Sequence, residues 1–167
     1  MKKRGFLMLL VALLISTMLV ACSTKTDTPN TGEVTDHDHG EFEWIGEFEL
    51  EAGEYLFHFG ESEDETMDVA FIKMGDNITD LEHHASHLML SDKENIKQDS
   101  SFVAKPDYAY TFEMNEDHGH ISFTIEEAGT YAIVTEHMPF ESSMQIFDKD
   151  DIEILPIREH EAGDHEH

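Results

Sequence analysis

Residues 108–125 read YAYTFEMNEDHGHISFTI, and this stretch decides the fold class. Large apolar side chains stand at every second position, first from Tyr108 to Met114 and again from Ile121 to Ile125. Because successive side chains of a strand point to opposite faces of a sheet, this period of two predicts a pair of half-buried strands. The polar residues between the two runs, which include a glycine, predict a turn.

Similar short stretches elsewhere predict further strands, at residues 44–50, 54–60, 67–74, 98–103, 129–137, 142–148 and 151–157. Turn-forming segments such as Glu51-Ala52-Gly53 separate them. Many short antiparallel strands, without alternating helices between them, predict an all-β sandwich of the Greek-key type.

One segment, residues 79–90, departs from the strand pattern. Leu81 and Ala85 stand at a helical interval, and Thr79 precedes Glu82 by three residues, which is the spacing of a capping box. We therefore predict one short helix, capped by Thr79 and inserted in the β-sandwich.

The first 21 residues have the order of a secretory signal: basic residues, then an apolar run, then small residues. The sequence Leu19-Val20-Ala21-Cys22 resembles the lipobox of bacterial lipoproteins, in which the cysteine becomes the lipidated first residue. The resemblance implies that acyl chains such as palmitate on Cys22 anchor the protein to the cell membrane, on its extracytoplasmic face. The alternatives are a free thiol after an ordinary signal, or an uncleaved anchor.

These patterns divide the chain into four expected parts. They are a lipoprotein signal peptide at 1–21, a flexible acidic tether at 22–41, the sandwich at 42–158, and a tail rich in histidine and acid at 159–167. The sandwich part is long enough to bury a single core without cross-links.

The composition is strongly acidic, with 37 acidic and 10 basic residues and a formal net charge of −27. Such a field argues against nucleic acid and anionic membrane surfaces as partners, because both require basic patches. It also raises the concentration of cations near the protein. The charge alone is not specific, because a solvated, repulsive surface gives the same count.

The chain contains 12 histidines, and neutral imidazole is a common ligand of divalent transition metals. His83 and His87 stand four residues apart on the predicted helix, so their side chains share one face and can chelate one ion. His84 stands one residue round the helix, nearer to the domain. The alternative is a solvated helix whose histidines are incidental.

His58 stands in a predicted strand between Phe57 and Phe59, which belong to the core. Its side chain is therefore expected on the opposite face of the sheet, either at a covered rim or in solvent.

Residues 128–138 read AGTYAIVTEHM and resemble the last metal-binding strand of cupredoxins, in which a strand with glycine and tyrosine leads into a loop with cysteine, histidine and methionine. Thr135 stands at the cysteine position and His137 at the histidine position, while Met138 or Met144 stands near the methionine. The resemblance implies a cupredoxin-like sandwich. A blue-copper centre is not expected, because it requires a thiolate and the only cysteine is Cys22.

These observations predict a site of imidazole and carboxylate ligands. Its candidate ligands are His58, His83, His84, His87, Glu136 and His137, with Glu82 as a further oxygen donor. Such a set suits Zn²⁺, with Cu²⁺ and Ni²⁺ as alternatives.

The remaining seven histidines are interpreted differently. Five belong to polar terminal segments that could collect ions by composition alone, namely His37, His39, His160, His165 and His167. His118 and His120 are expected in a solvent-exposed turn.

The sequence thus predicts a membrane-tethered, extracytoplasmic binding protein, not an enzyme, that captures a divalent transition metal or delivers it to a transporter. A metal-dependent extracytoplasmic enzyme and a structural lipoprotein with incidental histidines are the alternatives.

Overall fold

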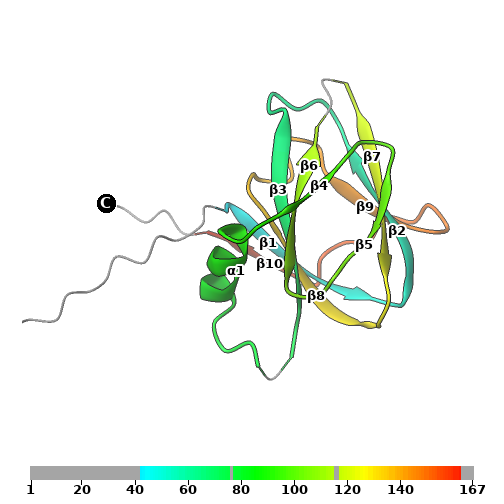
Figure 1. Ribbon diagram of the computed structural model, residues 1–167. Helices are drawn as coiled ribbons and strands as arrows, with labels where there is room; N and C mark the ends of the chain where they lie inside the picture. The colour runs from blue at the N-terminus through cyan, green and yellow to red at the C-terminus, as the bar shows by residue number, and fades with distance from the viewer. Residues whose placement is uncertain (1–41, 76, 115–116, 163–167) are drawn as a thin grey trace, which may run out of the picture. The chain divides into compact units, whose positions relative to one another are not determined.

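The computed structural model describes residues 42–75, 77–114 and 117–162, and these residues form two sheets packed face to face. Sheet A has the strand order β10-β1-β8-β3-β6-β4, and sheet B has the order β5-β7-β2-β9. Figure 1 shows both sheets, with helix α1 outside them. The prediction of an all-β sandwich with one short helical insertion is confirmed. The elements are β1 (Trp44–Leu50), β2 (Gly53–Phe59), β3 (Thr66–Lys73), α1 (Leu81–Met89), β4 (Glu94–Ile96), β5 (Ser101–Val103), β6 (Tyr108–Glu113), β7 (Gly119–Ile125), β8 (Gly129–Thr135), β9 (Gln145–Asp148) and β10 (Arg158–Glu161).

Aromatic side chains from both sheets form the core between them. The ring of Phe57 lies 4.7 Å from that of Phe123, 5.4 Å from that of Phe112 and 6.1 Å from that of Phe71, measured between centroids. All four side chains are buried. Burying one such side chain contributes about 1.5–3 kcal/mol relative to leaving it exposed. The alternating apolar positions of β6 and β7 therefore point inward, as the sequence predicts.

The segment between α1 and β6 forms two short strands, not the single strand predicted at residues 98–103. β4 pairs in parallel with β6 of sheet A and β5 pairs in parallel with β7 of sheet B, so the expectation of antiparallel strands is wrong here. Asp99 lies between the two strands with a positive φ of 56°, and its N–H donates to the carbonyl of His120 at 2.8 Å. At this turn the chain passes from one sheet to the other, a change that side-chain alternation does not reveal.

Helix α1 covers the outer face of sheet A. Its Ala85 and Met89 are buried against Ala70, Ile72 and Ala109 in a second, smaller apolar cluster. The small side chains of the sheet let the helix approach closely. β3 consequently has buried residues on both faces, and its sequence is nearly continuously apolar.

The cap of the helix differs from the prediction by one residue. Asp80, not Thr79, has the extended backbone of an N-cap, and its carboxylate accepts a 3.1 Å hydrogen bond from the N–H of His83. The capping-box spacing between Thr79 and Glu82 is therefore incidental. Both an aspartate and a threonine can cap a helix. Asp80 takes this role because it immediately precedes Leu81, the first residue of the helix.

The C-terminal segment also differs from the prediction. Residues 151–157 form no strand, apart from an isolated bridge between Glu153 and Phe147. Instead, β10 pairs antiparallel with β1 along its whole length. The domain boundary expected at 158 thus falls at the start of a strand, and His160 belongs to the sandwich, not to the tail. β10 reads REHE, so no apolar residue marks it as a strand in the sequence.

In the described part of the chain, no helix has the length and apolar character needed to cross a bilayer. The predicted signal peptide, the lipidation of Cys22 and the tether lie outside the described residues. The same holds for His37, His39, His165 and His167.

Candidate metal-binding sites

His137 lies in the loop after β8, and contacts of its neighbours fix this loop. Thr135 is fully buried, and its hydroxyl donates a 2.6 Å hydrogen bond to the carbonyl of His137. The N–H of Glu136 donates to the carbonyl of Asp68 at 3.0 Å, and its carboxylate accepts from the N–H of Asp68 at 3.0 Å. Thr135, at the position that resembles the cupredoxin cysteine, therefore orients the loop, and Glu136 has one carboxylate oxygen committed to the backbone of β3.

A tight turn at residues 139–144 brings Glu141 back toward His137. The N–H of Glu141 donates to the carbonyl of Met138 at 3.0 Å. The carboxylate of Glu141 consequently lies 3.8 Å from Nδ1 of His137, four residues earlier in the chain. The strand predicted in this region starts only at Gln145, because the turn includes its first residues.

Two further carboxylates reach this loop from distant parts of the sequence. Glu43 precedes β1, and one of its carboxylate oxygens accepts a 3.0 Å hydrogen bond from the N–H of Met138. Asp64 precedes β3, and its Oδ2 lies 3.5 Å from Nε2 of His137. Each nitrogen of the imidazole thus has a carboxylate beside it.

Glu43, His137 and Glu141 form a group that could hold a metal ion, and we call it the His137 site. One ligand atom from each residue lies within 4.8 Å of the others. Ligand atoms on one tetrahedral zinc ion are about 3.3 Å apart when the bonds are about 2.0–2.1 Å long, so small side-chain rotations would close the group around an ion. The His137 side chain is 30% exposed and both glutamates are exposed, which leaves the group open to solvent.

The charge around His137 favours a cation. Glu43, Glu141 and Asp64 place three carboxylates around one imidazole. A divalent ion would relieve the repulsion among them. If a metal bound between Nδ1 of His137 and Glu141, Nε2 would remain free to donate a hydrogen bond to Asp64. A carboxylate that accepts from the second nitrogen of a ligating imidazole commonly fixes the orientation of the ring.

The helix brings two of its three histidines together. Nε2 of His83 lies 3.1 Å from Nε2 of His87, which confirms that these side chains share one face. His84 points elsewhere, and its Nε2 lies 3.0 Å from Oδ1 of Asp107. The helix therefore offers a pair of imidazoles to an ion, with His84 held by a carboxylate of a different segment.

The helix pair and the His137 site are far apart. The register between β3 and β6, extended by one residue, places Asp107, the partner of His84, opposite Ile72. The register between β3 and β8, extended by two residues, places His137 opposite Met67. Five positions along a strand correspond to about 16 Å. The six ligands predicted from the sequence consequently do not meet in one place.

His58 projects from the outer face of sheet B, on the side opposite its buried neighbours, as expected. Across the β2–β7 pair it lies opposite His120, with 5.1 Å between the ring centroids. The assignment of His120 to an exposed turn is wrong, because this residue belongs to β7 and is half-buried. β7 begins at Gly119, two residues before the apolar alternation that marks the strand in the sequence.

Two acidic residues of the His137 site, Glu43 and Glu141, and the neighbouring Asp64 are missing from the sequence-based ligand list. Glu141 had a usable signal, since it follows His137 by four residues. Glu43 and Asp64 had none, because strand pairing alone brings them to the loop.

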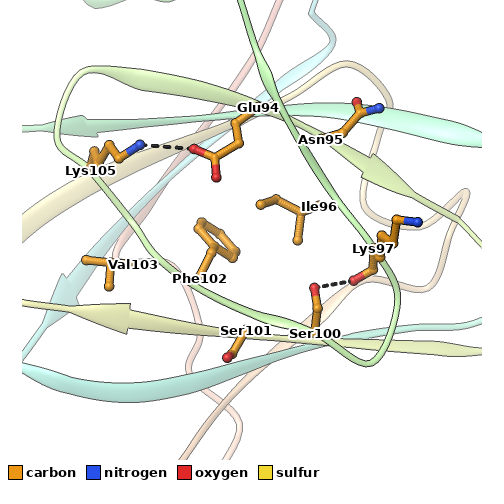
Figure 2. A pocket seen from close by; sticks show the side chains of 9 residues that line it. All are labelled: Glu94, Asn95, Ile96, Lys97, Ser100, Ser101, Phe102, Val103 and Lys105. Atoms are coloured by element: carbon orange, nitrogen blue, oxygen red, sulfur yellow. Dashed lines mark hydrogen bonds and ion pairs between the residues drawn. The ribbon is translucent and has the colours of Figure 1, made fainter.

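A hollow between β4 and β5 is separate from all of these histidines. Figure 2 shows Ile96 and Phe102 inside it and the ion pair between Lys105 and Glu94 at its edge, with 3.0 Å between Nζ and Oε2. None of its lining residues is a histidine. We therefore do not assign metal binding to this hollow.

Comparison of the chain with protein-family models, with curated proteins and with solved structures finds no match.

Proposed function

We propose that this protein is a membrane-tethered, extracytoplasmic binding protein for a divalent transition metal, with Zn²⁺ first and Cu²⁺ or Ni²⁺ as alternatives. It captures the ion at the His137 site and holds it for delivery to a transporter. Lipidation of Cys22 provides the tether. The observation that carries the proposal is the placement of His137 among Glu43, Glu141 and Asp64.

The chemistry of this group supports binding of a borderline cation. Imidazole nitrogen and carboxylate oxygen are both donor types that zinc accepts, and the remaining positions can be filled by water or by a receiving protein. The formal net charge of −27 raises the concentration of cations around the molecule. An exposed site releases its ion more readily than a deep pocket would, which suits capture and delivery better than catalysis.

Calorimetric titration with Zn²⁺ tests the proposal. The protein is the chain from residue 22 onward, carrying Cys22→Ser so that no acyl chain is attached. His37, His39, His165 and His167 are changed to asparagine, so that binding by the terminal segments does not hide the His137 site. We call this protein the reference chain.

We expect His137→Ala to weaken one Zn²⁺ binding event of the reference chain by tenfold or more, because changes around metal ligands typically cost about 10–100-fold in affinity. Glu141→Gln should weaken it as well. The matched control is His84→Ala, which removes an imidazole whose partner is Asp107. A His137→Ala titration with the same number of binding events and the same affinities as the reference chain would refute the assignment of the site.

A further inference from the structure

The outer face of sheet B gathers three histidines that the His137 site does not use. His58 on β2 and His120 on β7 are directly opposite in the strand register. His118 comes just before β7, and its ring lies 5.7 Å from that of His120 between centroids. The residue between them, Gly119, pairs with buried Phe59.

Gly119 keeps these histidines on the outer face. Its own face is filled by Gln98, whose Oε1 would lie 1.9 Å from a Cβ at this position. Any larger residue would therefore displace Gln98, which donates a hydrogen bond to the carbonyl of Glu113. The His-Gly-His sequence allows the strand to pack tightly inside while it presents two imidazoles outside.

Two of the three ring pairs are already spaced as ligands of one ion. Their centroids lie 5.1 Å apart for His58 and His120, and 5.7 Å apart for His118 and His120. Two imidazoles bound to one tetrahedral ion through bonds of about 2.0–2.1 Å have centroids about 5 Å apart. The interplanar angles of 53° and 78° show that the rings are not stacked, so their edges can turn toward a common point.

His58 also has an unmet requirement. Its Nδ1 is buried and has no hydrogen-bond partner among the described residues. Phe147 lies edge-on to the ring, with 6.4 Å between centroids, and Gln145 lies opposite His58 on β9. A buried ring nitrogen without a partner is unfavourable, and coordination of a metal through Nδ1 would give this nitrogen a partner.

We infer that His58, His118 and His120 form a second metal-binding site, independent of the His137 site. Its three imidazoles make it richer in nitrogen than the His137 site, which has one. Such a donor set takes Zn²⁺ with one position left for water, and it binds Cu²⁺ more tightly than Zn²⁺.

Imidazole nitrogen NMR of the reference chain during Zn²⁺ titration tests this inference, because each histidine is observed separately. We expect the ring signals of His58, His118 and His120 to shift together at one stoichiometric equivalent. In His58→Gln, the shifts of His118 and His120 should require at least tenfold more Zn²⁺. Cu²⁺ added afterwards should displace Zn²⁺ from the three rings.

Two variants separate this inference from the proposed function. In His137→Ala, the three rings of sheet B should respond to Zn²⁺ as before, whereas in His58→Gln the ring of His137 should respond as before. Melting curves of both variants in EDTA check that each is folded. If His58→Gln misfolds, His120→Gln replaces it, because His120 belongs to the same proposed site but lies on β7 instead of β2.

Three results would overturn the inference. One is that the remaining rings of the set shift unchanged in the folded variant, namely His118 and His120 in His58→Gln, or His58 and His118 in His120→Gln. Another is that the ring of His58 does not respond at saturating Zn²⁺. The third is that His137→Ala abolishes the response on sheet B. If the ring signals of sheet B shift with Zn²⁺ and the ring signal of His137 does not, only the proposed function is refuted.

Discussion

Oε1 of Glu47 lies 2.9 Å from Nε2 of His160 and 2.9 Å from a guanidinium nitrogen of Arg158. Glu47 belongs to β1 and its side chain is only 6% exposed, whereas both of its partners belong to β10. A buried carboxylate is costly unless it is paired. The final strand therefore completes the sandwich by supplying the hydrogen-bond partners that Glu47 requires, one of them the charged guanidinium of Arg158.

The pairing of Glu47 predicts a loss of stability in acid. Burial raises the pKa of Glu47, but the hydrogen bonds from His160 and Arg158 together lower it by more than burial raises it. The pKa therefore lies below its ordinary value of 4.5. The unfolded chain then binds this proton more readily than the folded chain. The carboxylate accordingly contributes its stability above about pH 4.5, and this contribution is lost as the pH falls through the folded-state pKa.

Denaturant unfolding over a range of pH measures this contribution. Glu47→Gln should be destabilised by about 1–3 kcal/mol at neutral pH, because its amide offers Arg158 and His160 one neutral acceptor oxygen in place of a charged carboxylate. It should also lose less stability than the natural chain between neutral pH and pH 4. Glu49→Gln, on an exposed position of the same strand, is the control. Equal acid sensitivity of natural and Glu47→Gln chains would contradict the argument.

The sequence predicts those parts of the fold that depend on apolar periodicity. β6, β7 and α1 were predicted because residues such as Phe112, Phe123 and Ala85 repeat at the period of their element. β10 was missed because Glu47 and His160 meet through charge, and charge leaves no periodic pattern. Buried apolar positions can thus be predicted from a short stretch of sequence, whereas a polar contact between distant residues cannot.

The candidate sites divide in the same way. The pairing of His83 with His87 follows from helix geometry within one turn, and the sequence predicts it. The approach of Glu43 to His137 depends on strand pairing across 94 positions, and nothing local encodes it. The pairing of His58 with His120 could have been anticipated only with the register of β2 and β7 in hand.

The cap of α1 provides a sharp comparison between neighbouring residues. Asp80→Ala should destabilise the protein by about 0.5–2 kcal/mol, because the N–H of His83 loses its acceptor. Thr79→Ala should have a much smaller effect, since Thr79 is not the N-cap. Thermal unfolding of both variants measures the difference. A larger effect of Thr79→Ala would restore the capping box predicted from the sequence.

The aromatic core predicts a large effect at Phe57. This side chain is fully buried and lies within 6.1 Å, between ring centroids, of Phe71, Phe112 and Phe123. Phe57→Ala should cost about 3–5 kcal/mol through lost burial and the cavity left behind. Phe140→Ala is the matched control, because Phe140 is 74% exposed and its loss should hardly change the denaturation midpoint. Comparable losses in the two variants would place the core elsewhere.

Metal binding to the native state must raise its stability. At a free Zn²⁺ concentration 100 times the dissociation constant, one site adds about 2.7 kcal/mol to the free energy of unfolding. We expect the melting temperature of the reference chain to rise with Zn²⁺ and to return to its starting value with EDTA. The rise should be smaller in His137→Ala and should diminish in acid, where protons compete with the metal for imidazole. No rise in the reference chain would leave the histidines without a metal-binding role in the folded protein.

The helix pair is expected to bind an ion independently of the loops. The 3.1 Å between Nε2 of His83 and Nε2 of His87 is close to the spacing of about 3.0–3.3 Å between neighbouring ligands on one ion with bonds of about 2.0–2.1 Å. Binding should cross-link one turn of α1 and slow amide exchange between Leu81 and Met89 when Ni²⁺ is added. His87→Ala should abolish this protection because one imidazole alone cannot bridge the turn, whereas His84→Ala should retain it. Protection that survives in His87→Ala would mean that the ion stabilises the helix from another site, and the pair would then be an ordinary hydrogen-bonded contact between two imidazoles.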